Sequence, residues 1–478
     1  MNCAVNDLSP YIPDADNPWN KARAVHLYRR AGFGADIDTL LSALDSDPLA
    51  VTDALIQGAL DLPLTPQPEF AFKVKSEYGL AVLESILERD GYARNWIIEL
   101  QNAGLRGRMT LFWHNHFVTR FDVYESSNYM WQYHKLLQEH ALGNFKDFVR
   151  QIGLTPAMLV FLNGTTNFAG NPNENYAREV YELFTLGEGN GYTQTDIEET
   201  ARAFTGYTNV TEEWGEIAFD PATHDAGTKT VFGQTGNWDY DDIIDLLFAE
   251  RADETATFIA GKLYQHFVNP VPCPEMIAEL AAVFQANDWD IAELMRAIFQ
   301  SAHFFDENNF ATVIYGHLEH LLIFYNEVQA EINGLSVLGI YADITQYGQA
   351  LFNPVDVAGW TGNRAWINTV NLIYRRNFQE SQTGLFALFG FGLFAEFVIK
   401  VTDETTDVDL VCRDIIQHFI PRGFQFEADY AAALVSFKGE IPQNYFEDGT
   451  WSVTYWATPF QLRDLLNFLV RMPEYQLK

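Results

Sequence analysis

The most evident shortage in this 478-residue sequence is of basic residues. Only 30 lysines and arginines stand against 64 aspartates and glutamates, so the formal net charge is −34. Tight nucleic-acid binding draws on counterion release by clustered Lys and Arg, and the sequence contains no basic stripe to supply it. The same shortage disfavours an anionic membrane as a partner. The acidity itself is most simply the surface of a soluble protein.

We therefore predict that the protein does not bind duplex DNA tightly. A fluorescence-anisotropy titration with a labelled duplex measures this property directly, and we expect no salt-sensitive signal at micromolar protein concentration. Salt-sensitive binding with a micromolar or lower Kd would show that the charge argument is wrong.

Cysteine and long apolar segments are also scarce. Cys3, Cys273 and Cys412 are odd in number and far apart, which predicts neither a disulfide framework nor a metal-ligand spacing. The longest apolar run, residues 385–395, is too short to span a membrane. The first residues lack a basic segment followed by an apolar one, so we expect no signal peptide and a soluble chain, cytoplasmic as written.

The common catalytic fingerprints are missing as well. The sequence has no Gly-x-Ser-x-Gly, His-Glu-x-x-His or Glu-x-x-His, and it lacks the glycine patterns of phosphate loops and dinucleotide-binding folds. No reaction is therefore named by a motif, and any site must be inferred from polar residues in apolar surroundings.

Apolar residues, by contrast, are plentiful. They make up 48% of the chain, which is enough for a sizeable core, and most of them recur with the helical period. We predict a mainly α fold, a large multi-helix assembly of two lobes: a leader arm at 1–20, an N-terminal lobe at 21–240 and a C-terminal lobe at 241–478. A single continuous domain is the alternative. Small β insertions are predicted near 207–235, where the helical period is lost, and near 449–457, where residues alternate.

The segment at residues 173–187 is the one around which the other candidate elements are placed. It predicts a single helix, with Pro172 suited to the first turn and Gly187 to a left-handed stop. A second helix follows after a glycine-rich turn, because Thr193 and Asp196, or Thr195 and Glu198, have the spacing of a capping box. The two helices should form a hairpin.

The first of these helices carries charges beside an apolar stripe. Glu179 and Glu182 lie three residues apart and so share a helix face. Partial burial would raise the carboxylate pKa values or call for a cation. Arg178 can pair with a glutamate four residues away. The alternative interpretation is a solvated flank with one ion pair.

These motifs lead to a family. The segment 174–187, with Tyr192-Thr193-Gln194 and residues 201–206, closely resembles the bacterial domain of unknown function 1800 family. Other similar segments, running in order along the chain, are 26–34, 113–117, 224–225, 262–267, 357–360 and 473–476. The resemblance implies a mostly helical fold and no settled activity. It also implies a frequent genetic neighbour similar to sulfatases and alkaline phosphatases, and exported relatives that leave the location open.

Histidines in two of these segments suit metal binding or proton transfer. His114 and His116 are two residues apart, so a regular helix cannot turn both toward one ion unless it ends or kinks there, and we favour His116. His224 and Asp225 lie in a predicted loop. There they can serve as metal ligands, as a general base or simply as turn residues. Histidines and carboxylates from separate elements suit a divalent metal ion, although a core histidine is the commoner role.

Together these observations predict a hydrolase-type enzyme whose site lies between helix 173–187, the turn at 113–117 and the loop at 224–225. Its candidate cofactor is a divalent metal ion. The sequence names no substrate, and a small molecule and a glycan are both candidates. The alternative is a non-catalytic scaffold or partner of the sulfatase- or phosphatase-like neighbour. The predicted catalytic residues are Arg178, Glu179, Glu182, His224 and Asp225, and the predicted metal ligands are His114, His116, Glu179 and His224.

Two tryptophans complete the set of candidates. Trp360 and Trp366 flank a short polar loop and offer flat faces on which a sugar-like or apolar ligand can stack. The alternative is that both side chains anchor the loop to the core.

Overall fold

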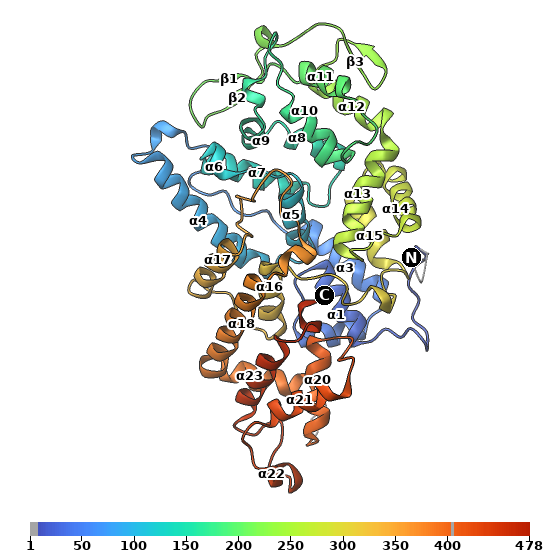
Figure 1. Ribbon diagram of the computed structural model, residues 1–478, viewed down its shortest axis with the longest axis vertical. Coiled ribbons are helices and arrows are strands. Elements are labelled where there is room, and N and C mark those ends of the chain that lie inside the picture. The colour runs from blue at the N-terminus through green and yellow to red at the C-terminus, as the bar shows by residue number, and fades with distance from the viewer. Residues whose placement is uncertain (1–7, 403–405) are drawn as a thin grey trace.

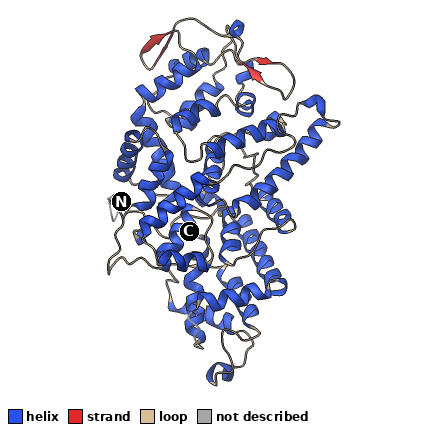
Figure 2. Cartoon of the chain, turned by 180° about the vertical axis from the view of Figure 1, so that it is seen from behind, coloured by secondary structure: helices blue, strands red, loops and turns tan. Residues whose placement is uncertain are grey.

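The computed structural model describes residues 8–402 and 406–478. The molecule is elongated and built almost entirely of helices, with its few strands gathered at one end (Figures 1 and 2). The predicted mainly α fold is confirmed.

The helices fall into two groups along the chain, before and after the strands. Those that precede the strands are α1 (Lys21–Ala31), α2 (Ile37–Leu44), α3 (Pro48–Asp61), α4 (Ala81–Leu100), α5 (Gly104–His116), α6 (Phe121–Tyr124), α7 (Ser127–Glu139), α8 (Phe145–Ile152), α9 (Pro156–Phe161), α10 (Asn175–Glu179) and α11 (Gln194–Ala203). Those that follow are α12 (Tyr240–Glu250), α13 (Ala252–Phe267), α14 (Pro274–Ala286), α15 (Ile291–Gln300), α16 (His317–Glu327), α17 (Ser336–Gln346), α18 (Thr369–Phe389), α19 (Phe391–Val401), α20 (Val408–Phe419), α21 (Glu427–Lys438), α22 (Gln443–Glu447) and α23 (Thr458–Leu469).

The β insertion predicted near 207–235 is confirmed as two antiparallel hairpins. β1 (Asn209–Val210) pairs with β2 (Ile217–Ala218), and β3 (Lys229–Val231) pairs with β4 (Gln234–Gly236). The second hairpin turns through Phe232 and Gly233, both at positive φ, as a two-residue turn between right-twisted strands requires.

The second predicted insertion, near 449–457, is wrong, because this segment is a loop. Trp451 and Val453 are buried, and the indole of Trp451 donates a hydrogen bond to Gln461 Oε1 at 2.8 Å. The alternation therefore reflects side chains that pack onto α23. A strand also needs a partner, and no segment within residues 8–402 and 406–478 pairs with this one.

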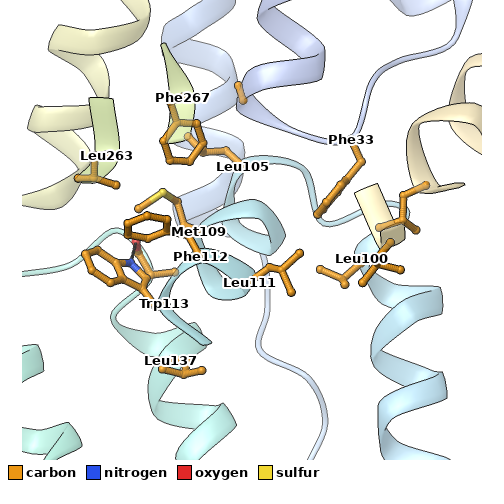
Figure 3. Packing of buried hydrophobic residues seen from close by; sticks show 14 of the residues in the cluster. Phe33, Leu100, Leu105, Met109, Leu111, Phe112, Trp113, Leu137, Leu263 and Phe267 are labelled. Carbon is orange, nitrogen blue, oxygen red and sulfur yellow. Dashed lines mark hydrogen bonds between the residues drawn. The ribbon is translucent and has the colours of Figure 1, made fainter. Parts of the chain in front are cut away.

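Helix α5 lies at the centre of the core. Met109 and Phe112 face Leu263 and Phe267 of α13, and Leu137 of α7 lies on the other side (Figure 3). All five side chains are at most 8% exposed. The segment that ends α5 is thus held by packing from several helices.

The N-terminal helices contact the C-terminal half of the chain. α1 packs against α20, α2 against α19 and α3 against α15. Residues 9–11 of the predicted leader arm also pair with residues 300–302, while residues 1–7 lie outside the described range. These contacts cross the predicted boundary at residue 240, so the division into two lobes stays a prediction.

The structure also bears on the expectations about membrane spans and about cysteines. Among the described residues, no single helix has the length and hydrophobicity to cross a membrane. Helices α18 and α19 reach that length and hydrophobicity only when taken together, and the pair is bent by 99°. Cys273 is disulfide-bonded, contrary to the expectation from cysteine spacing, whereas Cys412 is a buried free thiol. Spacing along the chain does not report distances in the folded protein.

Candidate functional site

The predicted helix 173–187 is present but changes its winding. α10 covers Asn175–Glu179 and runs directly into a π-helical turn, η3 (Val180–Thr185). The amide of Leu186 donates to Tyr181 O at 2.9 Å, five residues back. π-helical turns are rare and occur frequently at functional sites. We call α10 and η3 together the motif helix.

The ends of the motif helix differ in how well they were predicted. Pro172 lies outside the helix, which begins at Asn175, so its expected place in the first turn is wrong. Gly187 has a φ of +92°, as expected of a left-handed stop. A Cβ there would meet the Phe258 ring of α13 at 3.0 Å, so glycine also permits this close approach.

The predicted helical hairpin is confirmed. The Thr193 side chain caps the Asp196 amide, and Asp196 in turn accepts hydrogen bonds from the Thr193 amide and hydroxyl at 2.8 and 2.7 Å. Asp196 Oδ1 also accepts a hydrogen bond from the Phe232 amide at 2.7 Å. The second helix of the pair, α11, is therefore fixed both to its own first turn and to the β3–β4 hairpin.

The two central carboxylates of the motif helix have different surroundings. Arg178 bonds Glu182 at 3.1 Å and Glu174 at 2.9 Å, so Glu182 has a cationic partner. Among the described residues, Glu179 has neither a hydrogen bond nor an ion pair. Its half-buried position raises its pKa, the charge of Glu182 raises it further, and Arg178 opposes both effects.

His114 and His116 occupy the end of α5 and face different neighbours. His114 Nε2 accepts a hydrogen bond from the Phe352 amide at 2.9 Å, and burial lowers its pKa to about 3. His116 Nε2 lies 3.0 Å from Phe184 O of the motif helix and donates to it. The Nδ1 atoms of both rings are buried and have no hydrogen-bond partner in the described parts of the chain.

The loop that carries His224 and Asp225 is attached to α11. His224 Nδ1 donates to Thr205 O at 2.9 Å. Asp225 accepts from Arg202 Nε at 2.7 Å, and this hydrogen bond lowers the pKa of the carboxyl. Arg202 also pairs with Glu199 at 2.8 Å, so its partners are not the glutamates of the motif helix.

Two of the three predicted segments therefore meet, since His116 joins α5 to the motif helix. The loop at 224–225 is held by α11 instead. Within residues 8–402 and 406–478, no group of three or more His, Cys, Asp and Glu side chains is placed to hold a metal ion. The residue assignments stay predictions.

Lys262 of α13 is not among the residues predicted from the sequence. It lies close to His116, where α5 meets the motif helix. Burial lowers the pKa of His116 well below its ordinary value, and the charge of Lys262 lowers it further. The available signal was a lysine within residues 262–267, one of the segments that carry the family resemblance.

The comparisons with known proteins give one match. The family model described as "Protein of unknown function (DUF1800)" matches residues 26–477, nearly the whole chain. No curated protein and no solved structure matches. The chain therefore belongs to the DUF1800 family of proteins of unknown function.

Proposed function

We propose that this protein is a hydrolase-type enzyme in which Glu179 of the motif helix transfers a proton. The observation that supports the proposal is the environment of this carboxyl: half-buried, without a hydrogen bond or ion pair among the described residues, and with a raised pKa. A carboxyl with a raised pKa can hold a proton nearer to neutral pH and release it, as acid–base catalysis requires.

The second carboxyl has a supporting role in this proposal. Glu182 is paired with Arg178, so the two acids, three residues apart, have unlike environments. Paired acids of this kind often divide the roles of proton donor and charge-stabilising group. Glu179 would protonate a leaving group or activate water, while Arg178 orients Glu182 and offers charge to an anionic substrate.

The variant Glu179→Gln tests this role once a substrate is found. A screen of chromogenic esters, glycosides, phosphate esters and sulfate esters should identify an activity. That activity should then fall by roughly 100- to 10,000-fold in Glu179→Gln. Glu188→Gln changes an exposed glutamate in the following turn and should leave the rate unchanged. Equal rates for both variants and the parent would refute the role of Glu179.

Stability gives a readout that needs no substrate. Because the pKa of Glu179 is raised above the ordinary glutamate value of 4.5, the folded state holds this proton more tightly than the unfolded state does. The carboxyl then destabilises the fold increasingly as the pH rises from 4.5 through the folded pKa. Glu179→Gln should match the parent at low pH and become the more stable protein as the pH approaches 7.

Urea denaturation of both proteins at a series of pH values measures this difference. A Glu179→Gln protein that loses stability at pH 7 would place Glu179 in an ion pair and contradict the proposal. Elemental analysis of the purified protein tests the predicted divalent metal separately.

A non-catalytic scaffold is the second candidate. Its support is that Arg178, Glu182 and Asp225 have partners within the chain, as in a buried polar network that fixes a fold. Co-purification with a sulfatase- or phosphatase-like protein from the same source, together with no activity in the hydrolase screen, would favour this function.

A further inference from the structure

A cavity of about 330 Å³ lies between α5, α13, α16 and the loop at 357–366. This volume suits a small molecule of roughly monosaccharide size. The lining residues used below are Lys262, His266, Glu319, Trp360, Trp366 and Lys478. None of them belongs to the motif helix.

Lys262 is an unpaired cation at this cavity. Among the described residues it has no ion pair and no hydrogen bond. Its ammonium nitrogen lies over the Phe258 ring, 5.1 Å from the ring centroid. Burial lowers the pKa of Lys262 to about 8, with no carboxylate to offset it. In a chain with a net charge of −34, an ammonium group without an acidic partner is unexpected.

Two further polar atoms of the lining also lack partners. Trp360 Nε1 and His266 Nε2 are buried and make no hydrogen bond within the part of the chain that the structure describes. The indole N–H can only donate, and the neutral imidazole donates through Nε2 in one tautomer. Buried polar atoms without partners are rare in folded proteins, and here two of them line the cavity that Lys262 also lines.

The acidic side chain of the lining does not serve these donors. Glu319 bonds Lys478 Nζ at 2.7 Å and is also paired with Arg108. Burial lowers the pKa of Arg30, and the charge of the fully buried Arg108 lowers it further. Of the side chains that line the cavity, Lys262 and Lys478 are cationic and Glu319 is anionic, so the wall carries more positive than negative side-chain charge.

The aromatic part of the cavity is held in a fixed position. The Trp360 amide donates to Asn115 Oδ1 at 2.6 Å, and Asn115 Nδ2 donates to Trp360 O at 3.1 Å. A Cβ on Gly359 would meet the Asn115 carbonyl oxygen at 2.6 Å, so glycine permits this approach to α5. Trp366 lies beside Trp360, with ring centroids 6.5 Å apart.

We propose that this cavity binds a small organic anion. Its carboxylate, sulfate or phosphate group accepts hydrogen bonds from Lys262, Trp360 Nε1 and His266 Nε2, and its ring-shaped body lies against Trp360 and Trp366. An anionic group supplies the missing acceptors and the missing negative charge together. The proposal is independent of the role of Glu179.

Calorimetric titration with matched ligands tests the proposal. Glucuronate, glucose 6-phosphate and glucose 6-sulfate share one ring with neutral glucose, so they separate the charge from the body of the ligand. We expect at least one of the anions to bind and glucose to bind at least 10-fold more weakly. Inorganic phosphate and sulfate, which lack the ring, should bind more weakly than the corresponding esters.

Variants locate the binding. Lys262→Met should weaken the anion roughly 10- to 100-fold, the effect of losing a charged donor, whereas Lys262→Arg should restore part of it. The control Lys135→Met, on the exposed face of α7, should change nothing. Lys262→Met should unfold at no lower temperature than the parent, because it removes an uncompensated buried charge.

Three results would overturn the proposal: no binding of any anion at millimolar concentration, equal binding of glucose, or unchanged anion binding in Lys262→Met. A Lys262→Met protein that is markedly less stable would also overturn it, since it would show that the ammonium group stabilises the fold without a ligand.

Discussion

Replacing Glu327 with glutamine is expected to destabilise the protein by about 3–5 kcal/mol. Glu327 of α16 binds Arg29 of α1 through two hydrogen bonds, Nε to Oε1 at 2.6 Å and Nη2 to Oε2 at 2.9 Å. The two residues are 2% and 3% exposed. Arg29 also donates to the carbonyls of His418 and Phe419 in α20. The variant leaves this buried guanidinium without a counter-charge at the junction of the two halves.

Urea denaturation followed by tryptophan fluorescence measures the loss. The surface pair Lys135–Glu139 provides the control, because its two side chains are 43% and 34% exposed. Glu139→Gln should lower the free energy of unfolding by less than about 1 kcal/mol. A double variant, Arg29→Met with Glu327→Met, should be less destabilised than Glu327→Gln, because no charge is left unpaired. A Glu327→Gln protein as stable as Glu139→Gln would contradict this account of the junction.

A loss of similar size, about 3–5 kcal/mol, is expected for Trp113→Ala. Trp113 is fully buried at the end of α5, and its ring lies 5.6 Å from that of Phe145 and 5.5 Å from that of Phe148. Its indole also donates to Ala141 O at 3.0 Å. The variant removes the ring that α5 and α8 share and leaves a carbonyl without its donor.

The chain contains a matched control for this experiment. Trp456 is 67% exposed, so Trp456→Ala should change the free energy of unfolding by no more than about 0.5 kcal/mol. Thermal denaturation followed by circular dichroism compares the two variants with the parent. Equal melting temperatures for Trp113→Ala and Trp456→Ala would show that α5 is not the centre of the core.

Features set by local sequence were the ones that could be predicted. The capping box of Thr193 and Asp196 and the left-handed Gly187 depend on neighbours within a few residues, and both are present. The π-helical turn of the motif helix was not foreseen, because no local residue pattern requires it. Its five-residue hydrogen bonds accompany tertiary packing against α5 and α13.

Features set by distant contacts were missed or misassigned. Residues 449–457 alternate like a strand, but they only bury Trp451 and Val453 against helices. Within the apolar run at 385–395, the chain bends by 99° between α18 and α19 and leaves the side chain of Phe389 85% exposed. Burial on one side produces the same sequence pattern whether the backbone is a strand, a loop or a bent helix.

The candidate site shows the same limit. The spacing of Glu179 and Glu182 indicated that they share a helix face, but not that Arg178 pairs with one of them alone. The position of Lys262 beside His116 joins segments that lie far apart in the sequence. No spacing rule connects such segments, so the cavity beside Lys262 could be found only in the folded structure.

Glu179, which has no hydrogen bond or ion pair among the described residues, is expected to hold its proton more tightly than an ordinary glutamate. Carbon-13 NMR of glutamate-labelled protein, with Glu179→Gln used to assign the resonance, measures its titration directly. We expect Glu179 to titrate above pH 4.5, the ordinary value for glutamate. A midpoint at or below pH 4.5 would contradict it, and with it the proposed proton transfer on the motif helix.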